Sequence, residues 1–154
     1  MALVDYTALT KATGWSEAAP ICAAEPVSGV DKTYWRKVRL DFALTNLAAA
    51  DWIKFMVIPA HTYVNQIMVS VLTADAATTV LTFGDAATND SLSWLATCSG
   101  AVANVVYPTL AADTNGATAG LYYHTAGALY MSSDGICDTL KIDVYVHCMN
   151  LDPA

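Results

Sequence analysis

Two neighbouring residues near the C-terminus, His147 and Cys148, are of the types that carry out acid–base and nucleophilic chemistry. Such a pair works only if the histidine reaches the thiol, with both side chains on the same side of the backbone. The surrounding segment, residues 139–149 (TLKIDVYVHCM), alternates polar and apolar residues, which is typical of a half-buried β-strand. Because successive side chains of a strand point to opposite faces, we expect His147 and Cys148 to diverge, with Cys148 in the core.

The two other histidines, His61 and His124, belong to no recognisable catalytic motif. The sequence contains no G-x-S-x-G, no H-E-x-x-H and no glycine-rich phosphate loop. A hydrolase on a sandwich scaffold would require one of the three histidines to meet a carboxylate in a cleft. We expect a protein without enzymatic activity or cofactor.

The four cysteines show neither C-x-x-C spacing nor histidines at zinc-ligand intervals. They are Cys22, Cys98, Cys137 and Cys148, and we expect structural, reduced thiols. The loop at residues 84–90 (GDAATND) offers closely spaced oxygen ligands that suit calcium, but the full ligand series of a known calcium loop is missing. We therefore favour turn residues there and predict no metal site.

The segments that would position these residues are predicted to be strands separated by Gly-, Asn- and Asp-rich turns. The expected strands span residues 38–44, 52–58, 62–74, 78–84, 91–97, 103–109, 120–125, 128–133 and 139–149. In the third of them the apolar residues change face, which predicts a bulge or a bend near Asn65–Gln66. The pattern predicts an all-β fold, an antiparallel, jelly-roll-like β-sandwich of about eight strands.

The N-terminal residues differ from the rest of the chain. Residues 1–36 mix isolated aromatic residues with proline and glycine and keep neither a helix nor a strand period, although a short helix around residues 16–25 is compatible with them. We expect an extended arm over residues 1–36 and a β-sandwich domain over residues 37–154.

Charge and hydropathy restrict the partners. The net charge is −7; residues 1–54 hold six basic and six acidic residues, whereas residues 55–154 hold one basic and eight acidic residues. An acidic surface repels phosphate, so we expect no nucleic acid as partner. No apolar run is long enough for a membrane helix, and the N-terminus lacks the pattern of a secretion signal. At 55% hydrophobic and 14% charged residues, the chain is expected to bury apolar surface between copies.

Aromatic residues near residues 111–120 suggest a carbohydrate-binding alternative. Tyr122, Tyr123 and Tyr130 would be the first candidates to stack on a sugar, although core packing is the default for aromatic residues in a sandwich.

Residues 55–90 (FMVIPAHTYVNQIMVSVLTADAATTVLTFGDAATND) carry a resemblance to a known group of proteins. The order IPA-x-T-Y-V, a long β-branched strand, an Ala/Thr loop and T-V-L-T-F-G-D resembles small β-sandwich virion proteins of tailed bacteriophages, in particular capsid decoration (cement) and head-fibre proteins. The closing strand, DTLKIDVYV, echoes theirs, with Leu140 where glycine is usual. The resemblance covers roughly residues 52–148 and leaves the N-terminal arm unmatched.

The resemblance implies a non-enzymatic virion protein, made in the host cytoplasm, that binds the outer shell of a phage head and stabilises contacts between capsomers. Its partners would be the major capsid protein and further copies of itself, with a trimer favoured. The contacting residues would lie in the arm and the following basic segment: Tyr6, Trp15, Lys32, Tyr34, Trp35, Arg36, Lys37 and Arg39. A receptor- or glycan-binding fibre or tail domain is the alternative.

Overall fold

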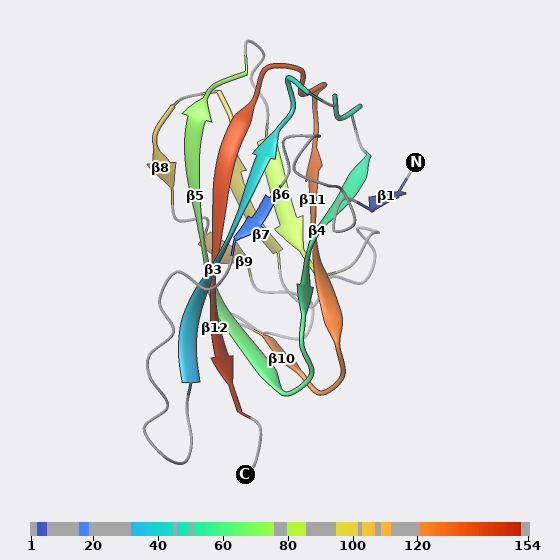
Figure 1. The fold of residues 1–154 in the computed structure, drawn as a ribbon. Helices are drawn as coiled ribbons and strands as arrows, with labels where there is room; N and C mark the ends of the chain where they lie inside the picture. The colour runs from blue at the N-terminus through green and yellow to red at the C-terminus, as the bar shows by residue number, and fades with distance from the viewer. Residues whose placement is uncertain are drawn as a thin grey trace.

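The computed structural model describes residues 3–5, 16–18, 32–44, 46–49, 51–75, 80–85, 95–101, 103–106, 109–111 and 121–151. Every regular element in these ranges is a strand, and the strands form two sheets packed face to face (Figure 1). No helix in this part of the chain is long and apolar enough to cross a membrane. The predicted all-β sandwich is confirmed.

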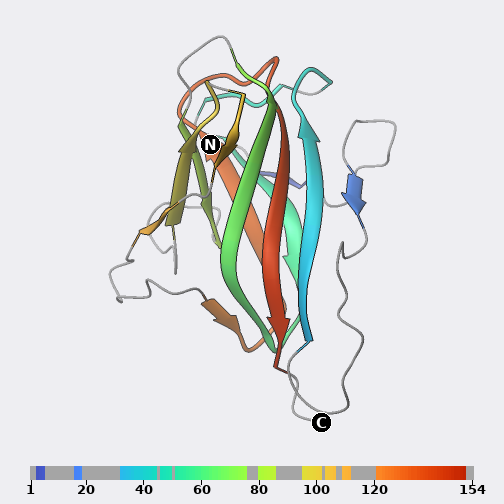
Figure 2. The same ribbon diagram turned by 90° about the vertical axis from the view of Figure 1, so that its left-hand side faces the viewer.

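The two sheets are called A and B. Sheet A consists, in order across the sheet, of β1 (Leu3–Asp5), β4 (Trp52–Ile58), β11 (Gly127–Ser133), β6 (Val80–Gly84), β7 (Leu95–Ser99) and β9 (Thr109–Ala111). Sheet B consists of β10 (Leu121–Tyr123), β5 (Thr62–Thr73), β12 (Lys141–Asn150), β3 (Lys32–Asp41) and β2 (Ser16–Ala18), and β8 (Val105–Val106) also pairs with β5. Figure 2 shows β5, β12 and β3 side by side, with sheet A behind them.

Eight of these strands have the connectivity of a jelly roll. They form the four-stranded sets β4-β11-β6-β7 and β3-β12-β5-β10, so the chain crosses between the sheets at most connections. The short strands β1, β2, β8 and β9 are additions to this frame. The pairing of β1 with β4 is parallel, whereas the other strand pairs are antiparallel.

The core between the sheets follows from the alternation seen in the sequence. In β12, Ile142, Val144, Val146 and Cys148 are fully buried. Burying a large aliphatic side chain contributes about 1.5–3 kcal/mol, and a shift of register by one residue would expose the whole row. The central position of β12, between β5 and β3, therefore fixes the register of sheet B.

The predicted bulge is confirmed. His147 pairs with Gln66 but Cys148 pairs with Val64, so Asn65 is the extra residue of β5. A second irregularity lies at the other end of β5, where Lys141 pairs with Thr73 and Ile142 with Val71, leaving out residue 72. The bulges let twelve residues of β5 match the shorter β12.

Two local expectations are wrong. Residues 38–44 were expected to be one strand with Leu44 on the core face, but β3 ends at Asp41 and Leu44 is 58% exposed. The chain turns there because the N–H of Phe42 donates to the carbonyl of Leu140 (2.9 Å), after which the N–H of Leu44 donates to the carbonyl of Asp41 (3.3 Å). Within the segment 16–25, residues 16–18 form strand β2 beside β3, not a helix, and the remainder lies outside the described residues.

Candidate interaction surface

Strand β3 carries most of the basic and aromatic segment that the sequence singled out. Its side chains alternate: Trp35, Lys37 and Arg39 lie on the outer face of sheet B, opposite the face of the buried Val38. Tyr34, on the inner side, packs against the hydrophobic core.

Arg36 also lies on the inner side of β3. Its Nη1 donates to the carbonyl of Val57 in β4 (2.5 Å), so this cation connects β3 of sheet B with β4 of sheet A. The segment therefore presents only part of its predicted contact residues on one surface.

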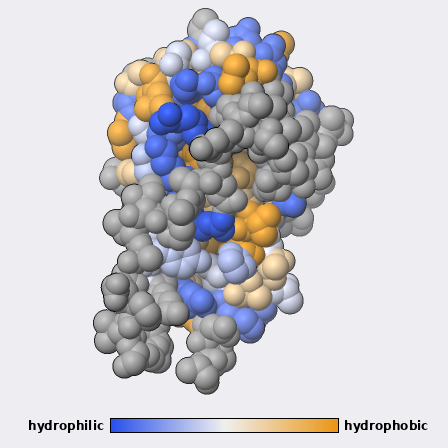
Figure 3. Space-filling view, viewed as in Figure 1, coloured by the Kyte–Doolittle hydropathy of each residue, from blue (hydrophilic) through white to orange (hydrophobic). Residues whose placement is uncertain are grey.

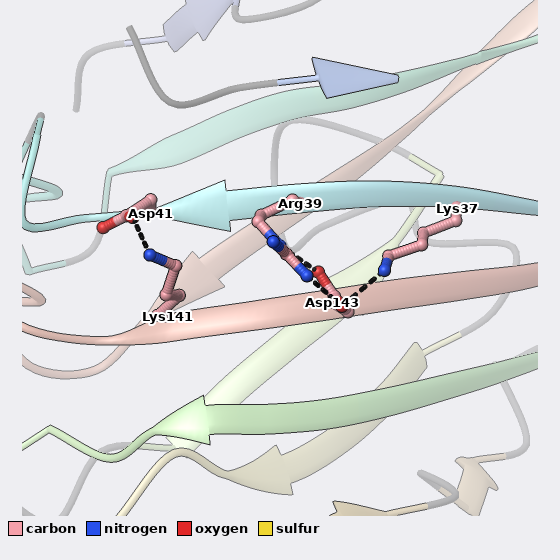
Figure 4. A network of polar contacts seen from close by, with 5 residues as sticks. All are labelled: Lys37, Arg39, Asp41, Lys141 and Asp143. Carbon is pink, nitrogen blue, oxygen red and sulfur yellow. Dashed lines mark hydrogen bonds and ion pairs between the residues drawn. The ribbon is translucent and has the colours of Figure 1, made fainter. Parts of the chain in front are cut away.

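The outer face of sheet B is organised around one carboxylate, that of Asp143 in β12 (Figure 4). Arg39 donates two hydrogen bonds to it, from Nε to Oδ1 (2.7 Å) and from Nη2 to Oδ2 (2.8 Å). Lys37 Nζ lies 2.6 Å from Oδ2. A second pair, Lys141 and Asp41, lies 2.5 Å apart at the end of the same two strands. The pairing follows from strand register, because Arg39 is opposite Asp143 and Asp41 is opposite Lys141.

The side chain of Asp143 is more buried than those of Lys141, Tyr145 and His147, which lie on the same face of β12. Its side chain is only 4% exposed, while those of Lys37 and Arg39 are 23% and 42% exposed. Burial alone would raise the pKa of Asp143, but the hydrogen bonds and charges of Arg39 and Lys37 outweigh burial and hold the pKa below its usual value. The same hydrogen bonds raise the pKa of both cations. Two cations thus share one anion, which leaves a surplus of positive charge among the described side chains of this face.

Aromatic rings continue this face along the strands. The rings of Trp35 and His147 lie 4.8 Å apart between centroids, and His147 Nδ1 donates to Oδ1 of Asn65 (2.6 Å), the extra residue of the β5 bulge. Lys37 Nζ lies 5.3 Å from the ring centroid of Tyr145, within the range of a cation–π contact. We call Trp35, Lys37, Arg39, Tyr145 and His147 the outer strip.

The question of a His147–Cys148 site is answered by this arrangement. His147 belongs to the outer strip, whereas Cys148 is fully buried in the core. Burial raises the pKa of both Cys148 and Cys137 to about 11, and both are free thiols. The side chains of Cys22 and Cys98 lie outside the described parts of the structure.

The three tyrosines proposed for glycan binding are not brought onto one surface. Tyr122 and Tyr123 alternate on β10, and Tyr123 is only 8% exposed, with its ring against Gly127. Its hydroxyl is buried and has no hydrogen-bond partner among the residues that the structure describes. Tyr130, half-buried, lies on β11 in the other sheet.

Of these three tyrosines, Tyr122 is the one whose described ring and hydroxyl contacts are with partly exposed histidines. Its hydroxyl lies 3.1 Å from Nδ1 of His61, and its ring packs edge-to-face on His124 with 4.5 Å between centroids. In the described residues the hydrogen-bond partners of His61 and His147 are thus a phenol and an amide. No group of three or more His, Cys, Asp or Glu side chains in those residues could hold a metal ion.

Some predicted residues lie outside the described structure. Tyr6 and Trp15 are among them, as are Asn89 and Asp90 of the loop considered for calcium. Lys32 begins β3, but its side chain is not described.

One feature was not predicted from the sequence: five large exposed apolar side chains lie toward one end of the sandwich, where β3, β5 and β11 end and β6 and β12 begin. They are Leu44 (58% exposed), Leu72 (43%), Val80 (40%), Val105 (56%) and Ile136 (59%). Figure 3 shows apolar residues among polar ones at this upper end of the molecule. We call these five residues the apical patch. The only hint in the sequence is Ile136, an isoleucine inside the turn SDGICD.

Backbone hydrogen bonds hold the connections of this end together. Leu47 and Cys137 exchange two bonds (3.0 and 2.9 Å), and the N–H of Val71 donates to the carbonyl of Asn104 (2.7 Å). Asp75, buried beneath the patch, accepts bonds at Oδ2 from the N–H groups of Asp138 (3.2 Å) and Thr139 (3.4 Å). The connecting segments around the apical patch are therefore held in place by hydrogen bonds to one another.

Comparison with known proteins places this fold. No protein-family model matches the chain, and no curated protein matches its sequence. Among solved structures, a chain in the capsid of Ralstonia phage GP4 superposes with a TM-score of 0.55 and 17% identity, covering 99% of this chain and 100% of the other. A chain in the acidic stable capsid of Helicobacter pylori bacteriophage KHP30 superposes with a TM-score of 0.53 and 13% identity, covering 77% of this chain and 87% of the other. The chain thus shares its jelly-roll fold with chains of phage capsid structures.

Proposed function

We propose that this chain is a non-enzymatic structural protein of a phage virion, and specifically a capsid decoration (cement) protein that binds the outer shell of a tailed-phage head and stabilises contacts between capsomers. The observation that carries the proposal is the superposition on a chain of the GP4 capsid, which extends over nearly the full length of both chains. A superposition that covers both chains almost completely supports equivalent roles in a shell.

The chemistry of the described surface supports a contact role. Its charged side chains of opposite sign meet in ion pairs on a sheet face, and the imidazoles are bonded to neutral groups. Trp, Tyr and Arg are the residue types enriched where proteins bind one another. The outer strip contains all three.

In this proposal the N-terminal segment and the basic segment of β3 contact the shell or a neighbouring subunit. The proposed partners are the major capsid protein and further copies of this chain, as a trimer. Because β3 begins at Lys32, a truncation that tests the arm must end at residue 31 to leave β3 whole. This truncation also removes the short strands β1 and β2, which lie outside the eight strands of the jelly roll.

The experiment compares the full chain and a variant lacking residues 1–31 for binding to capsids assembled without this protein. We expect the full chain to co-sediment with capsids and to raise the temperature at which they release DNA. The truncated chain should fold, as judged by circular dichroism, but not bind. Retained binding by the truncated chain would show that the arm is not the contact, and failure of the full chain to bind would refute the decoration role.

A receptor- or glycan-binding domain is the alternative, and Tyr122 is the residue that supports it, since its ring and the imidazoles of His61 and His124 gather near the end of β10. Loss of specific binding on a glycan array by Tyr122→Ala, with capsid binding unchanged, would favour this alternative.

A further inference from the structure

The structure places two complementary surfaces on different parts of one chain. The outer strip is aromatic and carries a surplus positive charge, because Lys37 and Arg39 share the single carboxylate of Asp143. The apical patch is apolar and is flanked by the exposed side chains of Asp134 and Asp138. The outer strip thus offers aromatic rings and positive charge, whereas the apical patch offers apolar side chains and negative charge.

The acidic residues of the apical end are fixed beside its apolar residues. Asp134 Oδ1 accepts a hydrogen bond from the N–H of Val80 (2.6 Å), and the backbone N–H of Asp138 is held by Asp75. The described ion pair near this end joins Lys141 and Asp41, whose opposite charges cancel. The exposed apical surface is therefore apolar with negative charge at its border.

The remaining exposed large apolar residue lies elsewhere and serves as a reference. Val57, 39% exposed, is near the far end of β4, opposite Ala128 at the start of β11. Five of the six exposed large hydrophobic residues of the described chain thus lie toward one end of the sandwich.

We propose that the chain self-associates head to tail: the apical patch of one copy docks on the outer strip of the next. Opposite charge brings the two surfaces together, and burial of the apolar side chains against Trp35 and Tyr145 supplies the affinity. Because the two surfaces differ, the contact is heterologous, and repeated contacts close into a ring when the rotation between copies permits it. The inference deepens the proposed function, since it assigns the contact that would build the proposed trimer.

The test uses two full-length variants, each lacking one surface. Ile136→Asp places a carboxylate in the apical patch, and Trp35→Ala removes the largest ring of the outer strip. We expect the wild-type chain to be an oligomer by sedimentation velocity and each variant to have the mass of one chain at the same concentration. Val57→Asp, the matched control for a new carboxylate at an exposed apolar site, should remain an oligomer.

Mixing the two variants distinguishes a heterologous contact from a symmetric one. Each variant keeps one intact surface, so an equimolar mixture should form a complex of two chains, one of each kind. A symmetric contact of patch on patch, or strip on strip, predicts no rescue, and absence of the two-chain complex would overturn the inference. A single-chain wild type, or oligomers retained by both variants, would overturn it as well.

Folding of the variants is checked by thermal melting. If Trp35→Ala does not fold, Tyr145→Ala replaces it, since that ring lies on the same strip and is partly exposed. Binding to capsids is measured separately, so a chain that binds capsids as a single copy would refute the head-to-tail contact and leave the decoration role standing.

Discussion

Replacing Asp143 by asparagine tests the polar network on which the outer strip is built. The substitution keeps the shape of the side chain but removes its charge, and it places an amide N–H₂ group near either Lys37 or Arg39, both of which can only donate. In the wild-type chain, Asp143 accepts two hydrogen bonds from Arg39, and its Oδ2 lies 2.6 Å from Lys37 Nζ. The variant therefore loses at least one charged hydrogen bond and the ion pair.

The expected loss of unfolding free energy depends on how far the two cations are buried. Removing one partner of a fully buried ion pair costs about 3–5 kcal/mol, because the other charge is left without water. Here the side chains of Lys37 and Arg39 are 23% and 42% exposed, so both cations can be rehydrated and the cost is smaller. A hydrogen bond to a charged group contributes roughly 1.5–3 kcal/mol. We expect Asp143→Asn to lower the free energy of unfolding by about 2 kcal/mol, which lowers Tm by roughly 4–8 °C in a chain of this size.

The matched control is Asp41→Asn on the same face. Asp41 forms an ion pair with Lys141, and the two side chains are 12% and 38% exposed, respectively. The carboxylate of Asp41 is more exposed than that of Asp143 and is ion-paired with one cation instead of two, so we expect a smaller loss, about 1 kcal/mol. Thermal and urea unfolding at pH 7 measure both variants. Equal losses for Asp143→Asn and Asp41→Asn, or no measurable loss for Asp143→Asn, would refute the assignment of Asp143 as the centre of the network.

Three further outcomes are expected. Because the folded-state pKa of Asp143 is depressed, its contribution is complete above about pH 4 and disappears as the pH falls through the folded pKa, so the wild type should lose more unfolding free energy on acidification than Asp143→Asn; equal losses would contradict this. Gly127→Ala brings a Cβ into the ring of Tyr123 and should cost about 1–3 kcal/mol, whereas Gly100→Ala, whose Cβ would lie 3.3 Å from the nearest side-chain atom, should cost less; chemical denaturation compares the two. Cys137 and Cys148, with pKa values raised to about 11 by burial, should resist iodoacetamide at pH 7.5 in the folded chain and react after unfolding, as site-resolved mass spectrometry would show.

Much of the strand content follows from local pattern. The range expected for β4 is identical to the observed one, and that for β5 ends one residue beyond it, because alternation of apolar residues reports directly which side chains face a core. The change of face along β5 also located the bulge at Asn65. Short strands in turn-rich segments were placed less well: the strand expected over residues 103–109 is two strands, β8 and β9, in different sheets.

The candidate surface was only partly predictable. The basic and aromatic composition of the segment around β3 marked it as a contact region, but composition does not say which residues share a face with which partners. Tyr34 packs on the core and Arg36 bridges to β4, while the outer strip gains Tyr145 and His147 from a strand about a hundred residues away. Tyr122 and Tyr123, neighbours in sequence, are separated by the same alternation.

The sequence by itself determined the long strands and the divergence of His147 from Cys148, because these depend on interactions among residues close in the chain. Only the tertiary structure decided that β12 lies between β5 and β3, that Asp143 is buried beside two cations, and that Leu44, Val105 and Ile136 are exposed toward the same end of the sandwich. These outcomes depend on which distant strands pair and in which register. That choice reflects the packing of the whole core, to which each segment contributes a small part.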